Sequence, residues 1–175
     1  MSTPTLKLVT YDPAWPALFA AEAERISRAF APRELPIEHI GSTSVPGLLA
    51  KPVIDIAIAV SSAEEAAECV APLQALGYEY RGMHGDDPAR RYFVLDAEGR
   101  RRVQIHMWIL PAAGWDRHLR FRDLLRARPD LAAAYAREKL RVADSVGWNK
   151  MAYSEAKGPF IEALLRGEEP PHGVD

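Results

Sequence analysis

The sequence predicts an α+β (α/β) fold, in which a small mixed β-sheet is flanked by helices and followed by a helical C-terminal third. Three observations predict it. Up to about residue 110, segments with the two-residue alternation of strands are interspersed with segments of helical spacing. Two of the strand segments have one apolar and one more polar face, which is typical of a sheet that covers a core. Beyond Pro111 only helical spacing remains.

The composition is that of an ordinary globular domain. The chain has 175 residues, of which 48% are hydrophobic and 26% charged, and its net charge of −2 gives no global attraction to nucleic acid or anionic membranes. We expect a single domain over residues 1–167 and a flexible tail over residues 168–175. The single cysteine, Cys69, excludes an internal disulfide framework. No signal-peptide pattern or membrane-length apolar run is visible, so we expect a cytoplasmic protein.

The first helix is predicted to begin at Asp12-Pro13, with Asp12 as N-cap and Pro13 at the first helical position. Its apolar residues recur at helical spacing as far as Phe30. A short strand over residues 37–40 follows and ends at Gly41. The next segment, residues 41–47, is rich in Gly, Ser, Thr and Pro, which favours a loop with at most one helical turn.

Residues 53–60 are predicted to form a strand with two different faces. One face carries the side chains that would pack on helices, namely Ile54, Ile56, Ile58 and Val60. The other face carries Asp55 among small residues, which leaves open space above the carboxylate. A carboxylate on such a strand is costly without partners, so Asp55 is functional or firmly hydrogen-bonded.

The middle of the chain is predicted to form a helix, a strand and a hairpin. Ser61 and Ser62 offer overlapping capping boxes for a helix that ends at Gly77. A strand over residues 78–81 and a mobile loop over 82–90 follow. Residues 91–96 and 101–110 form the hairpin. On its second strand, the face opposite the core carries Arg102, Gln104, His106 and Trp108.

The C-terminal third is predicted to contain helices over residues 115–127, 130–145 and 151–166, the last with a kink or break at Gly158-Pro159. Eleven arginines and six acidic residues lie between Arg81 and Arg128. Solvated strand edges and helix faces would account for most of them. The sharper interpretation is an arginine-lined wall for a polyphosphate.

A turn and a carboxylate together suggest phosphate chemistry. Ser42, in the Gly/Ser/Thr turn, precedes Asp55 by thirteen residues. A Gly-Ser turn allows close backbone approach and supplies hydroxyl donors, and a strand carboxylate supplies a hard oxygen ligand for Mg²⁺. Phosphoryl and nucleotidyl transfer need these parts, together with positive charge for the leaving pyrophosphate.

Several motifs resemble the GrpB family over nearly the whole chain. They are the segment from Glu38 to Gly47, the segment from Lys51 to Ile56, Gln104-Ile105-His106, the helical residues 119–126 with Pro129, and Tyr153 with Lys157, Phe160 and Ile161. The resemblance implies the nucleotidyltransferase fold, because that family belongs to the nucleotidyltransferase superfamily. It also implies a relation to a domain that is fused to dephospho-CoA kinase in some bacteria.

The sequence departs from active members of that superfamily at the metal site. They place a second carboxylate two residues after the first, where this chain has Ala57. A third carboxylate comes from a later strand, where the candidates here are Gln104 and His106. Either one metal binds with substrate and water, or a His/Asp site takes a softer ion, or metal catalysis has been lost.

The predicted site has two groups of residues. The catalytic and metal-binding group comprises Asp55, His106 and Gln104. The nucleotide- and phosphate-binding group comprises Gly41, Ser42, Thr43, Ser44, Lys51, Tyr153 and Lys157. Each also has a structural interpretation; Tyr153 and Lys157, for example, share a helix face and are explained by base stacking with a phosphate contact or by ordinary packing.

Three other residues or groups have a structural and a functional interpretation. His39 caps the first strand or acts in the site, and Arg122 with Asp123 more often holds helices together than touches substrate. His84 with Asp86 and Asp87 could bind a metal, although a solvated loop fits that composition better.

The sequence therefore predicts a nucleotidyltransferase-like protein that binds a nucleoside triphosphate with Mg²⁺ or Mn²⁺. As an enzyme it would transfer a nucleotidyl or phosphoryl group to a small acceptor. The alternative is a catalytically degenerate module that binds a nucleotide or a phosphorylated metabolite. Nucleic acid and membrane are disfavoured as partners, because the charge balance is acidic and an aromatic-basic stripe is lacking. The acceptor and the oligomeric state stay open.

Overall fold

The computed structural model describes residues 7–83, 87 and 89–171. Its centre is a five-stranded sheet in the order β1-β2-β5-β4-β3. Strands β2 and β5 are parallel and the other neighbouring pairs are antiparallel, which confirms the predicted mixed sheet. The strands are β1 (Ile37–Ile40), β2 (Ile54–Val60), β3 (Glu79–Met83), β4 (Arg90–Ala97) and β5 (Arg100–Ile109).

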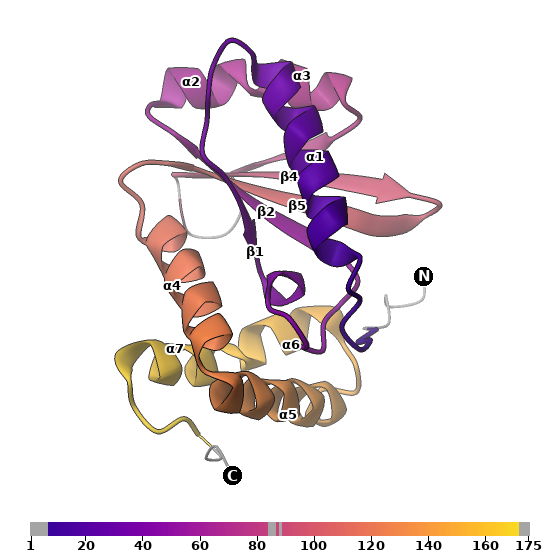
Figure 1. The fold of residues 1–175 in the computed structure, drawn as a ribbon, viewed down its shortest axis with the longest axis vertical. Coiled ribbons are helices and arrows are strands. Elements are labelled where there is room, and N and C mark those ends of the chain that lie inside the picture. Colours follow the sequence, from indigo (N-terminus) through magenta and orange to yellow (C-terminus); the bar gives the residue numbers. More distant parts are fainter. Residues whose placement is uncertain (1–6, 84–86, 88, 172–175) are drawn as a thin grey trace.

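Three helices pack on one face of the sheet and occupy the upper part of Figure 1: α1 (Trp15–Phe30), α2 (Ala63–Glu68) and α3 (Val70–Ala75). The predicted apolar faces of the two central strands point toward them. The buried core on this side includes Ile54, Ile56, Ile58 and Val60 of β2 and Val103, Ile105 and Met107 of β5. Cys69 is buried in the same core, and this burial raises the pKa of its thiol to about 11.

Four helices follow the sheet and occupy the lower part of Figure 1: α4 (Ala113–Ala127), α5 (Pro129–Ser145), α6 (Lys150–Ala156) and α7 (Gly158–Arg166). Helices α4, α5 and α7 enclose a second apolar cluster with Val45 and Leu48, which come from the segment after β1. This segment therefore joins the sheet to the helices. None of the helices in the described residues is long and apolar enough to cross a membrane.

Local details differ from the sequence predictions at two helices. The first helix has Ala14 as its N-cap, and Asp12 instead accepts a hydrogen bond from the Ala14 N–H at 2.8 Å. The helix predicted to run from Ser62 to Gly77 is divided at Cys69 into α2 and α3. Pro72 has no N–H with which to bond the carbonyl of residue 68, which explains the interruption. The predicted break near Gly158-Pro159 is confirmed as the junction of α6 and α7.

The β4–β5 hairpin contains a bulge. Leu95 pairs with Val103, whereas Asp96 pairs with Arg101, so Arg102 is an extra residue in β5. Because a bulge places two residues opposite one, Arg101 is brought to the face of the sheet that carries Asp96 instead of the core face that simple alternation assigns to it. This face is the one opposite α1, α2 and α3.

Candidate functional site

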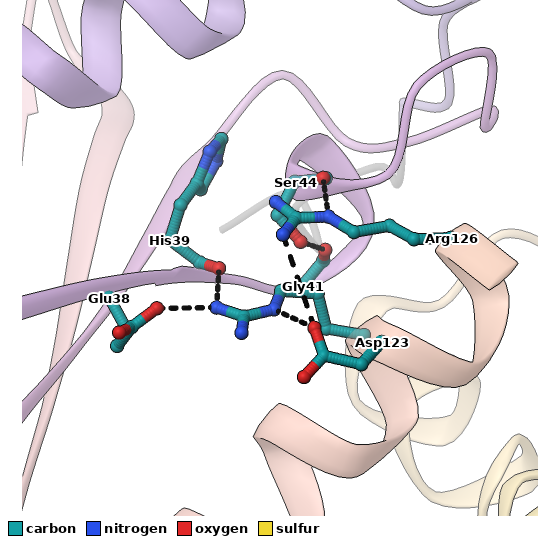
Figure 2. Close-up of polar contacts among 7 residues, drawn as sticks. Glu38, His39, Gly41, Ser44, Asp123 and Arg126 are labelled. Carbon is teal, nitrogen blue, oxygen red and sulfur yellow. Dashed lines mark hydrogen bonds and ion pairs between the residues drawn. The ribbon is translucent and has the colours of Figure 1, made fainter.

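The predicted turn is one turn of 3-10 helix, η1 (Ser42–Ser44), which follows β1 directly. Gly41 opens it with φ 71° and ψ −175°, a region open essentially only to glycine. A Cβ atom at Gly41 would lie 2.5 Å from Oδ2 of Asp55. The Ser44 hydroxyl donates to the Gly41 carbonyl at 2.6 Å and closes the turn, as Figure 2 shows. Glycine is thus required because the turn is pressed against the strand carboxylate.

His39 stabilises the turn through its contact with Thr43. Its Nε2 lies 3.0 Å from the Thr43 hydroxyl, and its ring stacks on Phe19 with 4.6 Å between centroids. The Thr43 hydroxyl donates to the Val53 carbonyl at 3.3 Å, so the hydrogen of its contact with His39 belongs to the imidazole. Burial lowers the pKa of His39 to about 4. His39 and Thr43 thus fix the shape of the turn as a neutral, buried pair.

A cavity of about 430 Å³ opens between this turn, the sheet and the C-terminal helices. It brings together residues predicted to act in one site from the turn, β2, β5 and the end of α6. Those of the predicted site residues that line it are Gly41, Ser42, Thr43, Lys51, Asp55, Gln104, His106, Tyr153 and Lys157. Ser44 does not line it; this residue faces a separate groove bordered by α4 and α5.

Three lysines surround one part of this cavity. Lys139 of α5 is only 1% exposed, and its Nζ donates to the Leu49 carbonyl and, at 3.2 Å, to the Ser42 hydroxyl. Lys51 and Lys157 lie over the ring of Tyr153, at 5.0 and 4.3 Å from its centroid. Tyr153 is itself buried, which favours a role in positioning these two ammonium groups.

Within the described residues, Lys139 and Lys157 form no salt bridge with a carboxylate. Burial, followed by the charges of Lys157 and Lys51, lowers the pKa of Lys139 to about 6. Burial and the charge of Lys51 lower that of Lys157 to about 8. Protonation of these lysines is therefore costly in the free protein, and a bound anion would offset that cost.

Lys139 was not among the predicted site residues. The sequence does indicate that Lys139 is buried. It lies four residues after Tyr135 and three before Val142 and therefore shares their buried helix face. A lysine on an otherwise apolar stripe is unusual, since an unpaired ammonium is rarely buried.

Asp55, Gln104 and His106 form one wall of the cavity. The pairing of β2 with β5 places Asp55 beside Gln104 and Ala57 beside His106. Nε2 of His106 lies 3.9 Å from Oδ1 of Asp55. The other ring nitrogen of His106 is buried and has no hydrogen-bond partner in the part of the chain that the structure describes. The three predicted catalytic and metal-binding residues are thus neighbours on one surface.

A second histidine, which the sequence analysis missed, continues this wall. His118 of α4 donates from Nδ1 to the Gly114 carbonyl at 2.7 Å, and its ring centroid lies 6.0 Å from that of His106. Burial, and then the charge of His106, lower the pKa of His118 to about 4. A Cβ at Gly114 would lie 2.6 Å from Nε1 of Trp108, so glycine allows α4 to approach the sheet here. The position of His118 in the sequence does not indicate that it lies near His106.

The residues present do not fit a two-metal centre. Ala57 is fully buried beneath Ile40, Trp108 and Ala112, which leaves neither a ligand nor space for one at the second carboxylate position. Within residues 7–83, 87 and 89–171, no group of three or more His, Cys, Asp or Glu side chains is arranged to hold a metal ion. Asp55 remains as a hard oxygen ligand beside the cavity. Asp87 accepts from Nε1 of Trp108 at 3.1 Å, and its predicted companions His84 and Asp86 lie outside the described residues.

Two arginines of α4 hold the turn in place from outside the cavity. Arg122 was predicted to hold helices together, and it instead joins α4 to β1. Arg122 donates to the Glu38 carboxylate at 2.6 Å and to the His39 carbonyl at 3.1 Å. Arg126 donates to the Ser44 carbonyl at 2.9 Å, a contact that Figure 2 shows beside Gly41 and Asp123. These contacts fasten α4 to both ends of the turn.

Sequence comparison finds similar proteins over most of the chain. A family model described as GrpB protein matches residues 5–166. UPF0157 protein PA4798 of Pseudomonas aeruginosa is 40% identical over 162 residues, which cover 91% of this chain and 66% of that protein. The dephospho-CoA kinase of Mycolicibacterium paratuberculosis is 32% identical over 184 residues, covering 92% of this chain and 45% of that enzyme. The chain thus spans about two thirds of one relative and under half of the other.

Comparison with solved structures gives the fold. GrpB from Enterococcus faecalis has a TM-score of 0.81 at 32% identity, covering 92% of this chain and 96% of that one. Terminal uridylyl transferase 4 from Trypanosoma brucei with bound dUTP has a TM-score of 0.57 at 13% identity, covering 90% of this chain and 55% of that one. A structure of the Cid1 poly(U) polymerase reaches 0.52 at 14% identity, covering 77% and 44%. The predicted nucleotidyltransferase-like fold is thereby confirmed.

Proposed function

This chain belongs to the GrpB family, and from that premise we propose that it binds the triphosphate of a nucleoside triphosphate in the cavity between the η1 turn and α5. The observation that carries the proposal is the group of three lysines, Lys51, Lys139 and Lys157, around the cavity beside Gly41 and Ser42. Burial of Lys139 and the charges of Lys157 and Lys51 both make its protonation costly, and its pKa falls to about 6. A polyanion would offset both costs.

The polar atoms of the turn suit the same ligand. Ser42 lines the cavity, where its hydroxyl accepts from Lys139 and is also hydrogen-bonded to Tyr135. Gly41 presents backbone without a side chain directly above Asp55. A phosphate at this turn would therefore meet a hydroxyl, backbone groups and the ammonium groups together.

Binding without transfer is the form of this proposal that the site supports best. Ala57 replaces the second carboxylate and is buried, so the two-metal chemistry of nucleotidyl transfer lacks its ligands. Transfer of a nucleotidyl or phosphoryl group to a small acceptor is the second candidate. The wall of Asp55, Gln104 and His106 favours it, because these polar side chains line the same cavity as the lysines.

Isothermal titration calorimetry with ATP, CTP, GTP and UTP tests the proposal, in Mg²⁺, in Mn²⁺ and in EDTA. Dephospho-CoA joins the screen because similar proteins bear the name dephospho-CoA kinase. We expect at least one triphosphate to bind, and Lys139→Met to weaken it by about tenfold to a hundredfold, as for a lost hydrogen bond to a charged group. The matched control is Lys7→Met, since Lys7 is exposed and outside the cavity lining.

The proposal is wrong if none of the four triphosphates binds, or if Lys139→Met binds them as Lys7→Met does. Asp55→Asn separates the two forms of the proposal. A metal-dependent gain in affinity that this variant loses, together with pyrophosphate release, would favour transfer. Equal affinity in EDTA and in Mg²⁺, with no pyrophosphate, would favour the binding module.

A further inference from the structure

A second cavity, of about 540 Å³, adjoins the first along the sheet. It lies over the face of β3, β4 and β5 that is turned away from α1, α2 and α3. In Figure 1 the β4–β5 hairpin projects well beyond the C-terminal helices, which lie beneath the other end of the sheet. The two cavities share Lys51, Arg90, Gln104, His106 and Ser154 in their linings. They are therefore two parts of one continuous surface.

Strand register shows that this surface continues the Asp55 wall. Asp55 pairs with Gln104, Gln104 pairs with Val94, and Val94 pairs with Glu79. Paired residues point to the same face of a sheet, so this row crosses from β2 to β3 on one side. His106 and Tyr92 form a second paired row next to it. A ligand on this face would lie within reach of both rows.

The bulge in β5 adds a cation that simple alternation would place on the core side. Arg101 lines the second cavity, whereas Arg102 does not. The Asp96 carboxylate holds the Arg101 guanidinium, and its Nη1 lies 3.4 Å from the Tyr92 hydroxyl. Bulges that re-aim a side chain are found often beside functional sites. Here the re-aimed residue is an arginine that its neighbours hold in one orientation.

The charges lining the second cavity all have one sign. Lys51, Arg81, Arg90 and Arg101 contribute cations, and none of its described lining residues is a carboxylate. Glu79 pairs with Arg81 at 2.8 Å and Asp96 with Arg101, but both acids lie outside that lining. Guanidinium groups match the geometry and charge of phosphate, and Lys51 and Arg90, which line both cavities, add positive charge beside the ion-paired Arg81 and Arg101.

We propose that the open face of β3, β4 and β5 binds a second ligand through a phosphate monoester group, next to the triphosphate cavity. The inference rests on the proposed function only in saying that a triphosphate binds next to this second ligand. The surface itself includes just one of the three lysines, Lys51. The second ligand is then a phosphorylated small molecule. It would be the acceptor if the protein catalyses transfer, and a second bound ligand if the protein is a binding module.

Two-dimensional ¹H–¹⁵N NMR on the whole chain tests this proposal, with glycerol 3-phosphate as the probe. Amide shifts of Ser42 and Thr43 report on the turn, and those of Val94 and Gln104 report on the strands. We expect saturable shifts of the strand amides, in the free protein and in protein saturated with a triphosphate. Sodium acetate at equal ionic strength should give no saturable shift.

The variant Arg101→Gln should weaken the response of the strand amides by about fivefold to tenfold, as expected for one charge-assisted hydrogen bond. Arg102→Gln is the matched control, because Arg102 is exposed and does not line the cavity. Arg81→Gln is the second variant, should Arg101→Gln alter the spectrum of the free protein. Arg101→Gln and Arg81→Gln should both leave unchanged the amide shifts that a triphosphate causes at Ser42 and Thr43.

The outcomes separate the two proposals. Strand shifts that stay linear with concentration, or that Arg101→Gln and Arg102→Gln affect equally, would overturn the second site while leaving the triphosphate cavity intact. Strand amides that saturate while the turn amides ignore every triphosphate would support the second site and refute the proposed function.

Discussion

At the scale of single residues, Gly41 shows how closely the turn and the strand fit. Its conformation lies where residues with a Cβ are strained, and the space that a Cβ would need is already taken by the Asp55 carboxylate. Two independent physical reasons therefore require glycine at this position. Gly47 has only the first of them, since its φ is 78° and no atom lies within 4 Å of where its Cβ would be.

We therefore predict that Gly41→Ala destabilises the protein by about 3 kcal/mol or more, from backbone strain and displacement of Asp55. Gly47→Ala should cost about 1 kcal/mol, from strain alone. Urea denaturation of both variants measures the difference. If both variants lose the same free energy of unfolding, the close approach of Gly41 to Asp55 does not contribute to the loss.

Other residues show which parts of the site can be predicted from the sequence and which cannot. The open strand faces of Asp55, Gln104 and His106 could be predicted from alternation, although the pairing of β2 with β5 that makes them neighbours is not a local property. His118 could not, since its approach to His106 depends on the angle at which α4 leaves the sheet. Lys139 could have been found as a cation on a buried helix face.

At the scale of elements, α4 is attached to β1 and η1 mainly through Arg122 and Arg126. The Arg122 side chain is 11% exposed and bonds the Glu38 carboxylate, the His39 carbonyl and the neighbouring Asp123. Loss of its guanidinium would leave a largely buried carbonyl without its donor. The attachment thus depends on one side chain that makes several charge-assisted bonds at once.

Arg122→Met should lower the free energy of unfolding by about 2 to 3 kcal/mol, because hydrogen bonds to charged groups are lost while the stem volume is kept. The control is Arg128→Met, whose guanidinium is exposed and pairs only with Asp130 among the described contacts. It should leave the denaturation midpoint unchanged. If both variants unfold alike, the Arg122 contacts do not stabilise the junction.

The elements themselves were largely predictable, while their interruptions were not. The strand over residues 37–40 and the apolar faces of β2 and β5 follow from hydrophobic alternation, and the structure confirms them. The division of α2 from α3 depends on Pro72 inside an otherwise continuous helical pattern. The bulge at Arg102 depends on pairing between two strands, which alternation within either strand does not reveal.

At the scale of the whole molecule, the candidate site lies between two separately packed parts. The sheet with α1 to α3 encloses one apolar core, and α4, α5 and α7 enclose another with the segment after β1. The turn belongs to the first part, whereas Lys139 and Lys157 belong to the second. The charges between these parts should therefore affect the stability of the entire chain.

The pH dependence of unfolding tests this between pH 7 and 8. The pKa of Lys139 falls from 10.5 to about 6 on folding, so the unfolded chain binds one more proton in this range. The free energy of unfolding should then rise with pH, by up to about 1.4 kcal/mol per pH unit. Urea denaturation of the wild type and Lys139→Met measures it, and the variant should lose this slope.

The two largely buried histidines contribute little to the slope between pH 7 and 8. His39 and His118 have a pKa of about 4, so their contribution lies between pH 4 and 6.5. Lys157, with a pKa of about 8, contributes mainly at higher pH. A wild-type slope equal to that of Lys139→Met would mean that the Lys139 amine keeps its proton in the folded protein.

The burial of Cys69 makes the protein convenient for attaching probes. Its thiol is inside the core and its pKa is about 11, so thiolate-seeking reagents should not react with it under native conditions. A cysteine introduced on η1 and another on α6 could therefore be labelled without first removing the natural one. Spin or fluorescent labels at these positions would report directly whether the sheet and the C-terminal helices approach each other when a ligand enters.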